Sequence, residues 1–428
     1  MDVAFDLDHD AWALARDAVD PLAGFRAQFL FPQHAGRDLH YFVGNSLGLQ
    51  PRAAAAAVTE ELERWSMQAV EGHFQGERPW MHYHATLREP MARVVGALPS
   101  EVVVMNSLTV NLHLLMASFY RPSRERPAIL IEAGAFPSDR HAVESQIRFH
   151  GFDPATDLIE LDADGPNGNI SLAAIERVLA EHGGRIALVL WPGVQYRSGQ
   201  AFDLAAIARM AKAQGCAVGF DLAHAAGNLP LALHDSGADF AVWCTYKYLN
   251  SGPGAVAAAF VHERHARRSD LPRLAGWWGH RAATRFLMGP AFDPEDGADG
   301  WQQSNPPILA MAPIRTSLAL FDAATMPALR EKSLALTACL ESLIRHHLDA
   351  VLEILTPADP VQRGAQLSLR VRGGRARGRA LFEHLAADGV LGDWREPDVV
   401  RISPVPFYNR FTDLLAFARS VRHWNQGP

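Results

Sequence analysis

Asp221 and Lys247 are the two residues whose types and positions point to the most distinctive chemistry in this chain. Asp221 opens the string DLAH, and Lys247 stands between Tyr246 and Tyr248. A lysine amine can hold an aldehyde cofactor as a Schiff base. A carboxylate keeps a pyridine nitrogen protonated, so that the ring accepts electrons from a substrate carbanion. Together the two residues predict a pyridoxal phosphate (PLP) site.

Both residues also have simpler interpretations. A lysine beside aromatic residues is commonly a solvated surface cation, and Asp221 can be the N-cap of a helix that begins at Leu222. The neighbouring sequence favours the cofactor site, because His224 is placed to hydrogen-bond a ring hydroxyl and a turn, Asn250–Gly254, follows Lys247. A carboxylate in a low dielectric favours the protonated pyridine through its opposite charge.

A phosphate group needs backbone N–H donors, which the N-terminus of a helix provides. The string Asn106–Thr109 follows an apolar run and is predicted to be a strand-to-helix turn, with the amides of Leu108 and Thr109 as donors. Ala135–Asp139 follows the next apolar run in the same manner. Phe136 is there a candidate to stack on the pyridine ring, or simply a core aromatic residue.

Short buried strands must hold these residues in place. From about Glu101 to Val261, short apolar runs alternate with helix-like stretches, which is typical of a mostly parallel sheet covered by helices. Asp221 then ends a strand at the edge where open α/β sheets bind ligands. The predicted strands are Val102–Met105, Ile129–Glu132, Ile186–Trp191, Ala217–Asp221, Phe240–Cys244 and Ala255–Val261. Helices are predicted over Leu204–Gln214, after an N-cap at Asp203, and between Ser171 and Gly183.

The pattern changes beyond Asn305-Pro306-Pro307. A long helical stretch, Leu309–Ala324, is followed by the strand candidates Gln366–Val371 and Val399–Ile402. We interpret this part as a smaller C-terminal α/β domain. The expected division is an N-terminal segment 1–50 that packs with the small domain, a large PLP-binding domain 51–308 and a small domain 309–428.

The composition indicates an ordinary globular protein that acts on small molecules. The net charge of −7 and the pI near 6.2 speak against nucleic-acid or membrane partners, which require clustered Lys and Arg. Cys216, Cys244 and Cys339 form no CxxC pair, so neither a disulfide framework nor a zinc knuckle is expected. The acidic N-terminus and the lack of an apolar run of ~18 residues favour a cytoplasmic protein without a membrane span.

Seven longer strings resemble the kynureninase family. They occur in the family's order over nearly the whole chain, and strings of this length are far more specific than a single lysine. They are GNSLGLQP (44–51), NSLTVNLHLL (106–115), FPSD (136–139), VGFDLAHAAGN (218–228), WCTYKYLN (243–250), GWWGH (276–280) and SNPP (304–307).

This resemblance implies a fold-type-I PLP transferase-like enzyme, a homodimer whose active sites lie at the subunit interface. It makes Lys247 the Schiff-base lysine and Asp221 the partner of the pyridine nitrogen. Pro192 departs from the pattern, because some members have a serine there and proline offers neither a hydroxyl nor an N–H. Trp277 and Asn305 are expected from the neighbouring subunit. The implied cofactor contacts are Leu108, Thr109, Phe136, Asp139, Asp221, His224, Tyr246, Lys247, Trp277 and Asn305.

The reaction implied by the resemblance is hydrolytic cleavage of the bond between the β-carbon and the γ-carbonyl of L-kynurenine or 3-hydroxy-L-kynurenine. The products are L-alanine and anthranilate or 3-hydroxyanthranilate, in tryptophan catabolism or NAD biosynthesis. Lys247 would move the α-proton, Tyr246 would assist as an acid or base, and Ser46 would line the carbonyl pocket. Arg401 matches the family's arginine for the substrate carboxylate, which arginine binds bidentately. Polar residues that resemble those of members favouring 3-hydroxykynurenine are His73, Ser304 and Asn305.

Rival interpretations remain open. Gly252–Ala257 matches the GxGxxA dinucleotide pattern, although the stretch after it also reads as a strand and no acidic residue follows at ~20 residues. His262-Glu263-Arg264-His265 is one residue short of HExxH, so no metal site is predicted. A cysteine desulfurase-like lyase is the nearest alternative among PLP enzymes, although no cysteine lies in a plausible mobile loop. A catalytically inactive PLP-binding scaffold is a further alternative.

Overall fold

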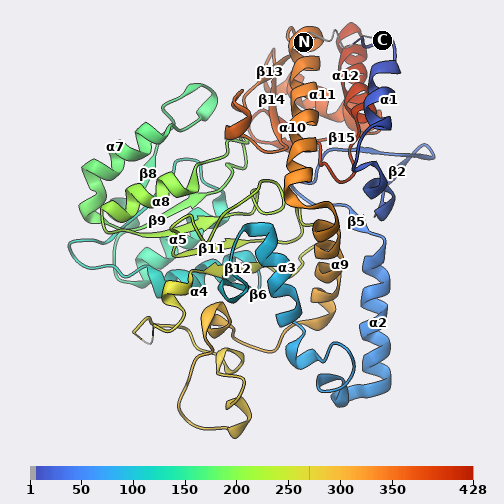
Figure 1. The fold of residues 1–428 in the computed structure, drawn as a ribbon. Coiled ribbons are helices and arrows are strands. Elements are labelled where there is room, and N and C mark those ends of the chain that lie inside the picture. Colours follow the sequence, from blue (N-terminus) through green and yellow to red (C-terminus); the bar gives the residue numbers. More distant parts are fainter. Residues whose placement is uncertain (1–5, 269, 428) are drawn as a thin grey trace.

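A seven-stranded sheet lies at the centre of the computed structural model, which describes residues 6–268 and 270–427 (Figure 1). The strand order is β6-β12-β11-β10-β9-β7-β8. The five strands from β11 to β8 run parallel, and β12 is antiparallel to both of its neighbours. The predicted, mostly parallel sheet is therefore confirmed. The strands span Val102–Val104 (β6), Ala128–Glu132 (β7), Leu158–Leu161 (β8), Ile186–Pro192 (β9), Ala217–Asp221 (β10), Phe240–Trp243 (β11) and Ala258–Val261 (β12).

Helices cover both faces of this sheet because its strands are apolar on both sides. In β7, Leu130 belongs to one core, whereas Ile129 and Ile131 belong to the core on the opposite face. The first face packs against α3, α7, α8 and α9, and the second packs against α4 and α5. These helices span Ala85–Val95 (α3), Leu108–Phe119 (α4), Pro137–Phe149 (α5), Leu172–His182 (α7), Leu204–Ala213 (α8) and Ile308–Ala324 (α9).

The sequence identified six of the seven strands because strands buried on both faces read as continuous apolar runs. The missed strand, β8, lies at the edge of the sheet and pairs only with β7. Its residues are partly exposed, so its sequence carries a weaker apolar signal. The helix caps are confirmed, since the side chains of Ser171 and Asp203 accept hydrogen bonds from the third residues of α7 and α8 at 3.1 and 2.9 Å.

A second core lies in the C-terminal part of the chain, around an antiparallel sheet of order β13-β14-β17-β16. Two of its strands confirm the predicted strands at 366–371 and 399–402. In Figure 1 this part is orange and red and lies above the large sheet. Its elements are α10 (Met326–Leu343), β13 (Leu352–Ile354), β14 (Leu367–Val371), α11 (Arg375–Ala387), β15 (Val390–Leu391), β16 (Asp393–Arg395), β17 (Val399–Ile402) and α12 (Phe411–Gln426).

The N-terminal segment contacts this C-terminal part. Helix α1 (Ala11–Ala18) lies beside α12, where Asp17 accepts a hydrogen bond from the Phe411 N–H at 2.7 Å (Figure 1). Strand β4 (His40–Tyr41) pairs with β15, while β1 (Phe29–Leu30) pairs with β5 (Gln50–Pro51) and β2 (Gln33–His34) with β3 (Arg37–Asp38).

The boundary between the large and small domains depends on α9. Its apolar side chains belong to the core of the large sheet, and it lies beside α2 (Ala53–Gln68) in Figure 1. The division at residue 309 stays a prediction, and we propose from this packing that the change of core falls within α10 instead.

No single helix in the described part of the chain is both long and apolar enough to cross a membrane. The helices α9 and Met326–Leu348 reach that length and apolarity only as a pair, and this pair is bent by 79°.

Candidate active site

Three neighbouring parallel strands end at one pocket. Strand β7 ends at Glu132, β9 at Pro192 and β10 at Asp221, and all three residues line this pocket. It lies at the carboxyl edge of the sheet, where open α/β folds bind ligands. The structure thereby brings together eight of the ten cofactor contacts predicted from the sequence. The other lining residues are Leu108, Thr109, Phe136, Ser138, Asp139, Val194, Tyr196, Ala223, His224, Tyr246 and Lys247.

Lys247 lies in the turn that follows β11, and its Nζ is 3.0 Å from Nε2 of His224. The chain contains only three lysines. The other two, Lys212 and Lys332, form ion pairs with aspartates at 2.9 and 2.7 Å. None of the ion pairs found between described residues involves Lys247. Its amine is therefore the lysine amine available to act as a nucleophile.

Three buried carboxyl groups line the same pocket: Glu132, Asp139 and Asp221. Burial raises the pKa of Glu132 to about 8. Burial and the neighbouring Asp221 raise the pKa of Asp139 well above its usual value, and burial raises the pKa of Asp221 as well. At neutral pH these raised pKa values favour the protonated forms of Glu132 and Asp139. A ligand that carries positive charge, such as a pyridinium ring, would favour the ionised carboxylates and be attracted to them.

Two buried polar atoms in the pocket lack hydrogen-bond partners among the described residues, Oδ1 of Asp139 and Nδ1 of His224. Burial, and then the charges of Lys247 and Arg401, hold the pKa of His224 well below its usual value, so its imidazole is neutral. A neutral imidazole can both donate and accept a hydrogen bond. These two atoms are thus placed to bind polar groups of a cofactor, and the residues present fit PLP.

Two helix N-termini meet at the pocket. Helix α4 begins at Leu108 without a side-chain cap from Ser107, and Oγ1 of Thr109 lies 2.8 Å from Oγ of Ser138 in the first turn of α5. The turn before α4 is held by Asn111, whose Nδ2 donates to the Met105 carbonyl at 2.9 Å. Uncapped N–H groups and the helix dipoles favour an anion there, which agrees with the predicted phosphate position.

Aromatic side chains form one wall of the pocket. The Phe136 ring is 43% exposed, packs edge-on against Tyr196 at 5.3 Å and lies 5.9 Å from Nζ of Lys247. It is therefore free to stack on a planar ring. Burial raises the pKa of Tyr246, so its hydroxyl is protonated at neutral pH and can donate a proton.

Arg401 is fully buried in β17, next to the pocket. Its Nη1 donates to the Tyr196 carbonyl at 2.8 Å, and its Nη2 donates to the Asp393 carboxylate. Burial lowers the pKa of Arg401 to about 10, which leaves the guanidinium charged at neutral pH. The guanidinium thus already holds a carboxylate, which is the group that an amino-acid substrate would present to it.

Besides Arg401, which lies next to the pocket, five other predicted residues do not line it within one chain. Ser46 is half-buried in the turn before β5, and His73 packs against Trp80 at 5.3 Å in the short helix η2 (Ala69–His73). Trp277, Ser304 and Asn305 are exposed. All three lie in the sequence between β12 and α9, a stretch that is yellow and gold in Figure 1. Their roles in the site stay predictions.

Six lining residues were not predicted as contacts. One is Pro192, which departs from the family pattern, and the others are Glu132, Ser138, Val194, Tyr196 and Ala223. Glu132 carries the signal that identified Asp221, a carboxylate at the end of an apolar strand, and could have been found in this way. The scarcity of lysine could likewise have strengthened the choice of Lys247. Tyr196 lies in a loop after β9, and only the fold shows that it reaches the pocket.

The structure also bears on the dinucleotide and cysteine desulfurase interpretations. The residues after the GxGxxA string form β12 rather than a helix, so the dinucleotide interpretation is wrong. All three cysteines are buried, and Cys244 directly follows β11. Burial raises its thiol pKa, which opposes formation of a nucleophilic thiolate.

Gly48 places the GNSLGLQP string directly against the turn that contains Lys247. Its N–H donates to the Tyr246 carbonyl at 2.9 Å. A Cβ at this position would overlap the Lys247 carbonyl oxygen and lie 2.8 Å from Cα of Asn250. Gly48→Ala is therefore expected to shift the lysine turn, cost about 1–3 kcal/mol of stability and weaken PLP binding.

Thermal unfolding and a PLP titration of the apo form measure both effects. Gly184→Ala is the matched control, because a Cβ there meets nothing within 4 Å. Equal behaviour of the two variants would contradict the close contact.

Comparison with known proteins shows relatives that are similar to this chain over almost its whole length. The chain is 68% identical over 98% of its length to kynureninase from Xanthomonas euvesicatoria pv. vesicatoria, 99% of which is covered, and 66% identical over 98% to kynureninase from Stenotrophomonas maltophilia, again with 99% covered. A family model described as the kynureninase C-terminal domain matches residues 329–421.

Solved structures show a similar fold at low identity. A cysteine desulfurase from Thermococcus onnurineus has a TM-score of 0.75 at 15% identity, with 91% of this chain and 95% of that chain covered. A C-DES mutant with glycine covalently linked to its PLP cofactor has a TM-score of 0.74 at 18% identity, with 92% and 98% covered. At these identities the likeness shows the fold alone.

Proposed function

The chain belongs to the kynureninase family, and we propose that it is a PLP-dependent hydrolase that cleaves L-kynurenine or 3-hydroxy-L-kynurenine between the β-carbon and the γ-carbonyl. The products are L-alanine and anthranilate or 3-hydroxyanthranilate. The observation that carries this proposal is the amine of Lys247, which forms none of the ion pairs found between described residues and lies in a pocket with three buried carboxyl groups at the carboxyl edge of the sheet.

Each residue has a proposed task in this reaction. PLP, when bound, withdraws electrons from the substrate carbons next to the amino group. Lys247 holds the cofactor through its Nζ and moves the α-proton, and Asp221 supplies the negative charge that keeps the pyridine nitrogen protonated. Arg401 binds the substrate carboxylate and fixes its orientation, while Tyr246 exchanges protons with the reacting carbons.

We further propose that the protein is a cytoplasmic homodimer with shared active sites. Supporting this, the segment with Trp277 and Asn305 exposes several large apolar side chains that a partner subunit would cover. These are Leu274, Trp277, Phe286, Leu287, Met288 and Phe292. In such a dimer, Trp277 and Asn305 of one chain complete the pocket of the other.

Mixed dimers test this sharing. A heterodimer of a Lys247→Ala chain and an Asn305→Ala chain, purified through two different tags, has one pocket with both residues intact. It is expected to regain about half of the wild-type turnover, since one of two symmetric sites is complete. Both homodimers are expected to be impaired.

A heterodimer of Lys247→Ala and Asp221→Asn chains is the control, because both residues belong to the same pocket of one chain and no complete site arises. If the Lys247→Ala and Asn305→Ala pair stays as inactive as this control, Asn305 does not act across the interface.

The substrate assay tests the proposed reaction itself. We expect the PLP-loaded protein to release anthranilate, followed by its fluorescence, and to prefer 3-hydroxykynurenine by roughly tenfold in kcat/KM. The reason is that His73, Ser304 and Asn305 offer polar groups to the ring, and a buried polar group left unpaired costs ~1–3 kcal/mol. A preference for plain kynurenine would contradict the assigned polar contacts, and no turnover of either compound would favour an inactive PLP-binding scaffold.

A further inference from the structure

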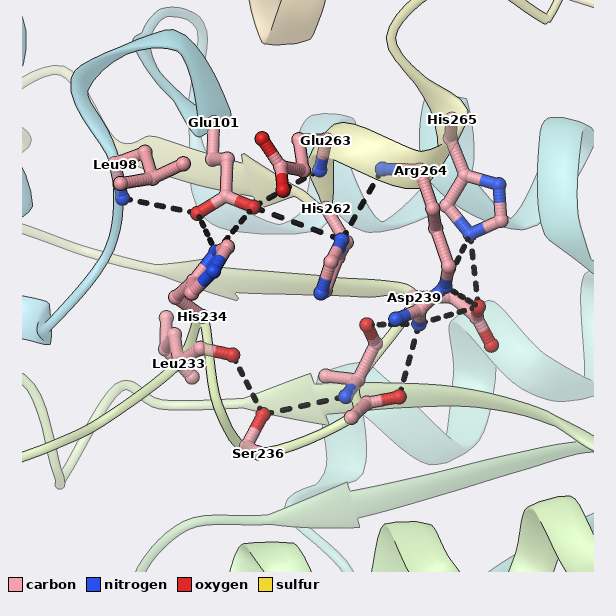
Figure 2. Close-up of polar contacts among 12 residues, drawn as sticks. Leu98, Glu101, Leu233, His234, Ser236, Asp239, His262, Glu263, Arg264 and His265 are labelled. Carbon is pink, nitrogen blue, oxygen red and sulfur yellow. Dashed lines mark hydrogen bonds and ion pairs between the residues drawn. The ribbon is translucent and has the colours of Figure 1, made fainter.

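A cluster of two histidines and a glutamate lies at the opposite edge of the large sheet from the PLP pocket. Glu101 ends the short helix η4 (Pro99–Glu101) just before β6, His234 lies in the loop between β10 and β11, and His262 directly follows β12. Figure 2 shows the two imidazole rings beside the Glu101 carboxylate. Since β6 begins and the antiparallel β12 ends at this edge, three segments far apart in the sequence meet here.

Glu101 is fully buried and rigidly held, yet none of its contacts within the described chain comes from a lysine or arginine. Its Oε2 accepts the Leu98 N–H at 2.9 Å and its Oε1 accepts the Glu263 N–H at 2.9 Å. The nearby Asp239 differs, because a lysine, an arginine and a histidine form ion pairs with its carboxylate. Figure 2 shows the arginine and the histidine, Arg264 and His265. Among the described residues, the ion-pair contacts of Glu101 therefore come from histidines alone.

The two histidines converge on this carboxylate. Nδ1 of His234 lies 3.0 and 3.1 Å from the two oxygens of Glu101, and Nδ1 of His262 lies 3.6 Å from Oε1. The two rings are stacked with centroids 5.2 Å apart. One ligand atom from each of the three residues lies within 4.8 Å of the others.

We propose that Glu101, His234 and His262 form a binding site for a divalent cation of the Zn²⁺ class. Two imidazole nitrogens and one carboxylate oxygen are a donor set that Zn²⁺ prefers, and tetrahedral ligands at ~2.0–2.1 Å lie about 3.3 Å from one another. The separations of 3.0 and 3.6 Å in this cluster bracket that value.

Other features of a metal site are also present. The His234 side chain is 32% exposed, which gives a solvent ion an entry path and leaves a fourth coordination position for water. The two backbone N–H groups on Glu101 orient the carboxylate, as second-shell hydrogen bonds do in metal sites. The cation would join three loops and replace the 3.2 Å hydrogen bond that Nδ1 of His262 accepts from the Arg264 N–H.

Protons compete with the cation at this cluster. The hydrogen bond to the Glu101 carboxylate raises the pKa of His234, whereas burial lowers the pKa of His262. Only a neutral imidazole can bind the cation. Metal affinity therefore falls as the pH falls. The charged and titratable groups facing the two rings are Glu101, Asp235, Glu263, Arg264 and His265.

Cobalt titration of the holoenzyme tests the site. After removal of metals with a chelator and of free PLP by dialysis, Co²⁺ is expected to bind with one equivalent per chain and to give visible absorption bands of a low-coordinate N/O site. His234→Gln and His262→Gln are each expected to weaken binding by more than about 100-fold, since even loss of a second-shell contact costs 10–100-fold. Zn²⁺ should displace Co²⁺ and raise the unfolding temperature of the unsubstituted protein, but not that of His234→Gln or His262→Gln.

His182→Gln is the control, because His182 is a surface histidine with a single carboxylate neighbour, Glu181, at 3.5 Å. It should bind Co²⁺ as the unsubstituted protein does. The histidine variants carry the test, since replacing Glu101 would also free two backbone N–H groups and disturb the fold without any metal. The proposal is overturned if no saturable binding occurs, or if binding survives in His234→Gln and His262→Gln.

Discussion

Replacing Lys247 with alanine is expected to lower kcat/KM for both kynurenines by about 10³-fold or more. The substitution removes both the covalent attachment of the cofactor and the general acid–base catalysis by the lysine, and the catalysis alone contributes 10²–10⁴-fold. No second amine can take over, because the other two lysines of the chain lie in ion pairs with aspartates. Anthranilate fluorescence and the absorbance of the bound cofactor measure the two effects.

Lys212→Ala is the matched control. It removes a lysine from α8 and breaks the ion pair with Asp239, so it is expected to lower stability while cofactor attachment and turnover remain. Turnover by Lys247→Ala within tenfold of the unsubstituted protein would show that Lys247 is not the reacting amine.

Asp221→Asn has the second largest expected effect, a loss of about 10²–10³-fold in kcat, because a preorganised charge partner of the reacting group is removed. The exchange isolates the charge, since an asparagine oxygen can still accept the Ala223 N–H that donates to Oδ1 of Asp221 at 2.7 Å. The substitution would also remove an anion that helps to raise the pKa of Asp139, so the pKa of Asp139 would fall. Single-turnover kinetics with kynurenine measure the chemical step directly.

Asp203→Asn serves as the control for this substitution. Asp203 caps α8, where asparagine caps equally well, so no change in kcat is expected. An Asp221→Asn enzyme as active as this control would mean that the pyridine nitrogen does not depend on a carboxylate.

The parts of the fold that could be predicted are those with a local sequence signal. Strands buried on both faces appear as apolar runs, and Asp221 was identified because a charged residue ends such a run. Ser171 and Asp203 were identified as helix caps from short-range patterns alone. The edge strand β8 lacks this signal. The strand order and antiparallel pairing of the sheet in the small domain also have no local sequence signal.

The parts that escaped prediction depend on contacts between distant segments. Tyr196 reaches the pocket because β9 ends beside β10, and its carbonyl is held by Arg401 in another part of the chain. The cluster of Glu101, His234 and His262 likewise exists only after three loops meet. No residue spacing predicts such a group, because the spacing of its members in the sequence has no relation to their distance in space.

Borohydride reduction of the holoprotein, followed by peptide mapping, tests the central claim most directly. Reduction fixes a cofactor that is covalently bound to a lysine amine and blocks tryptic cleavage there. The account predicts one labelled, uncleaved tryptic peptide spanning 213–264, with the label on Lys247. A label on Lys212 or Lys332, or no label on a protein that binds PLP, would contradict it.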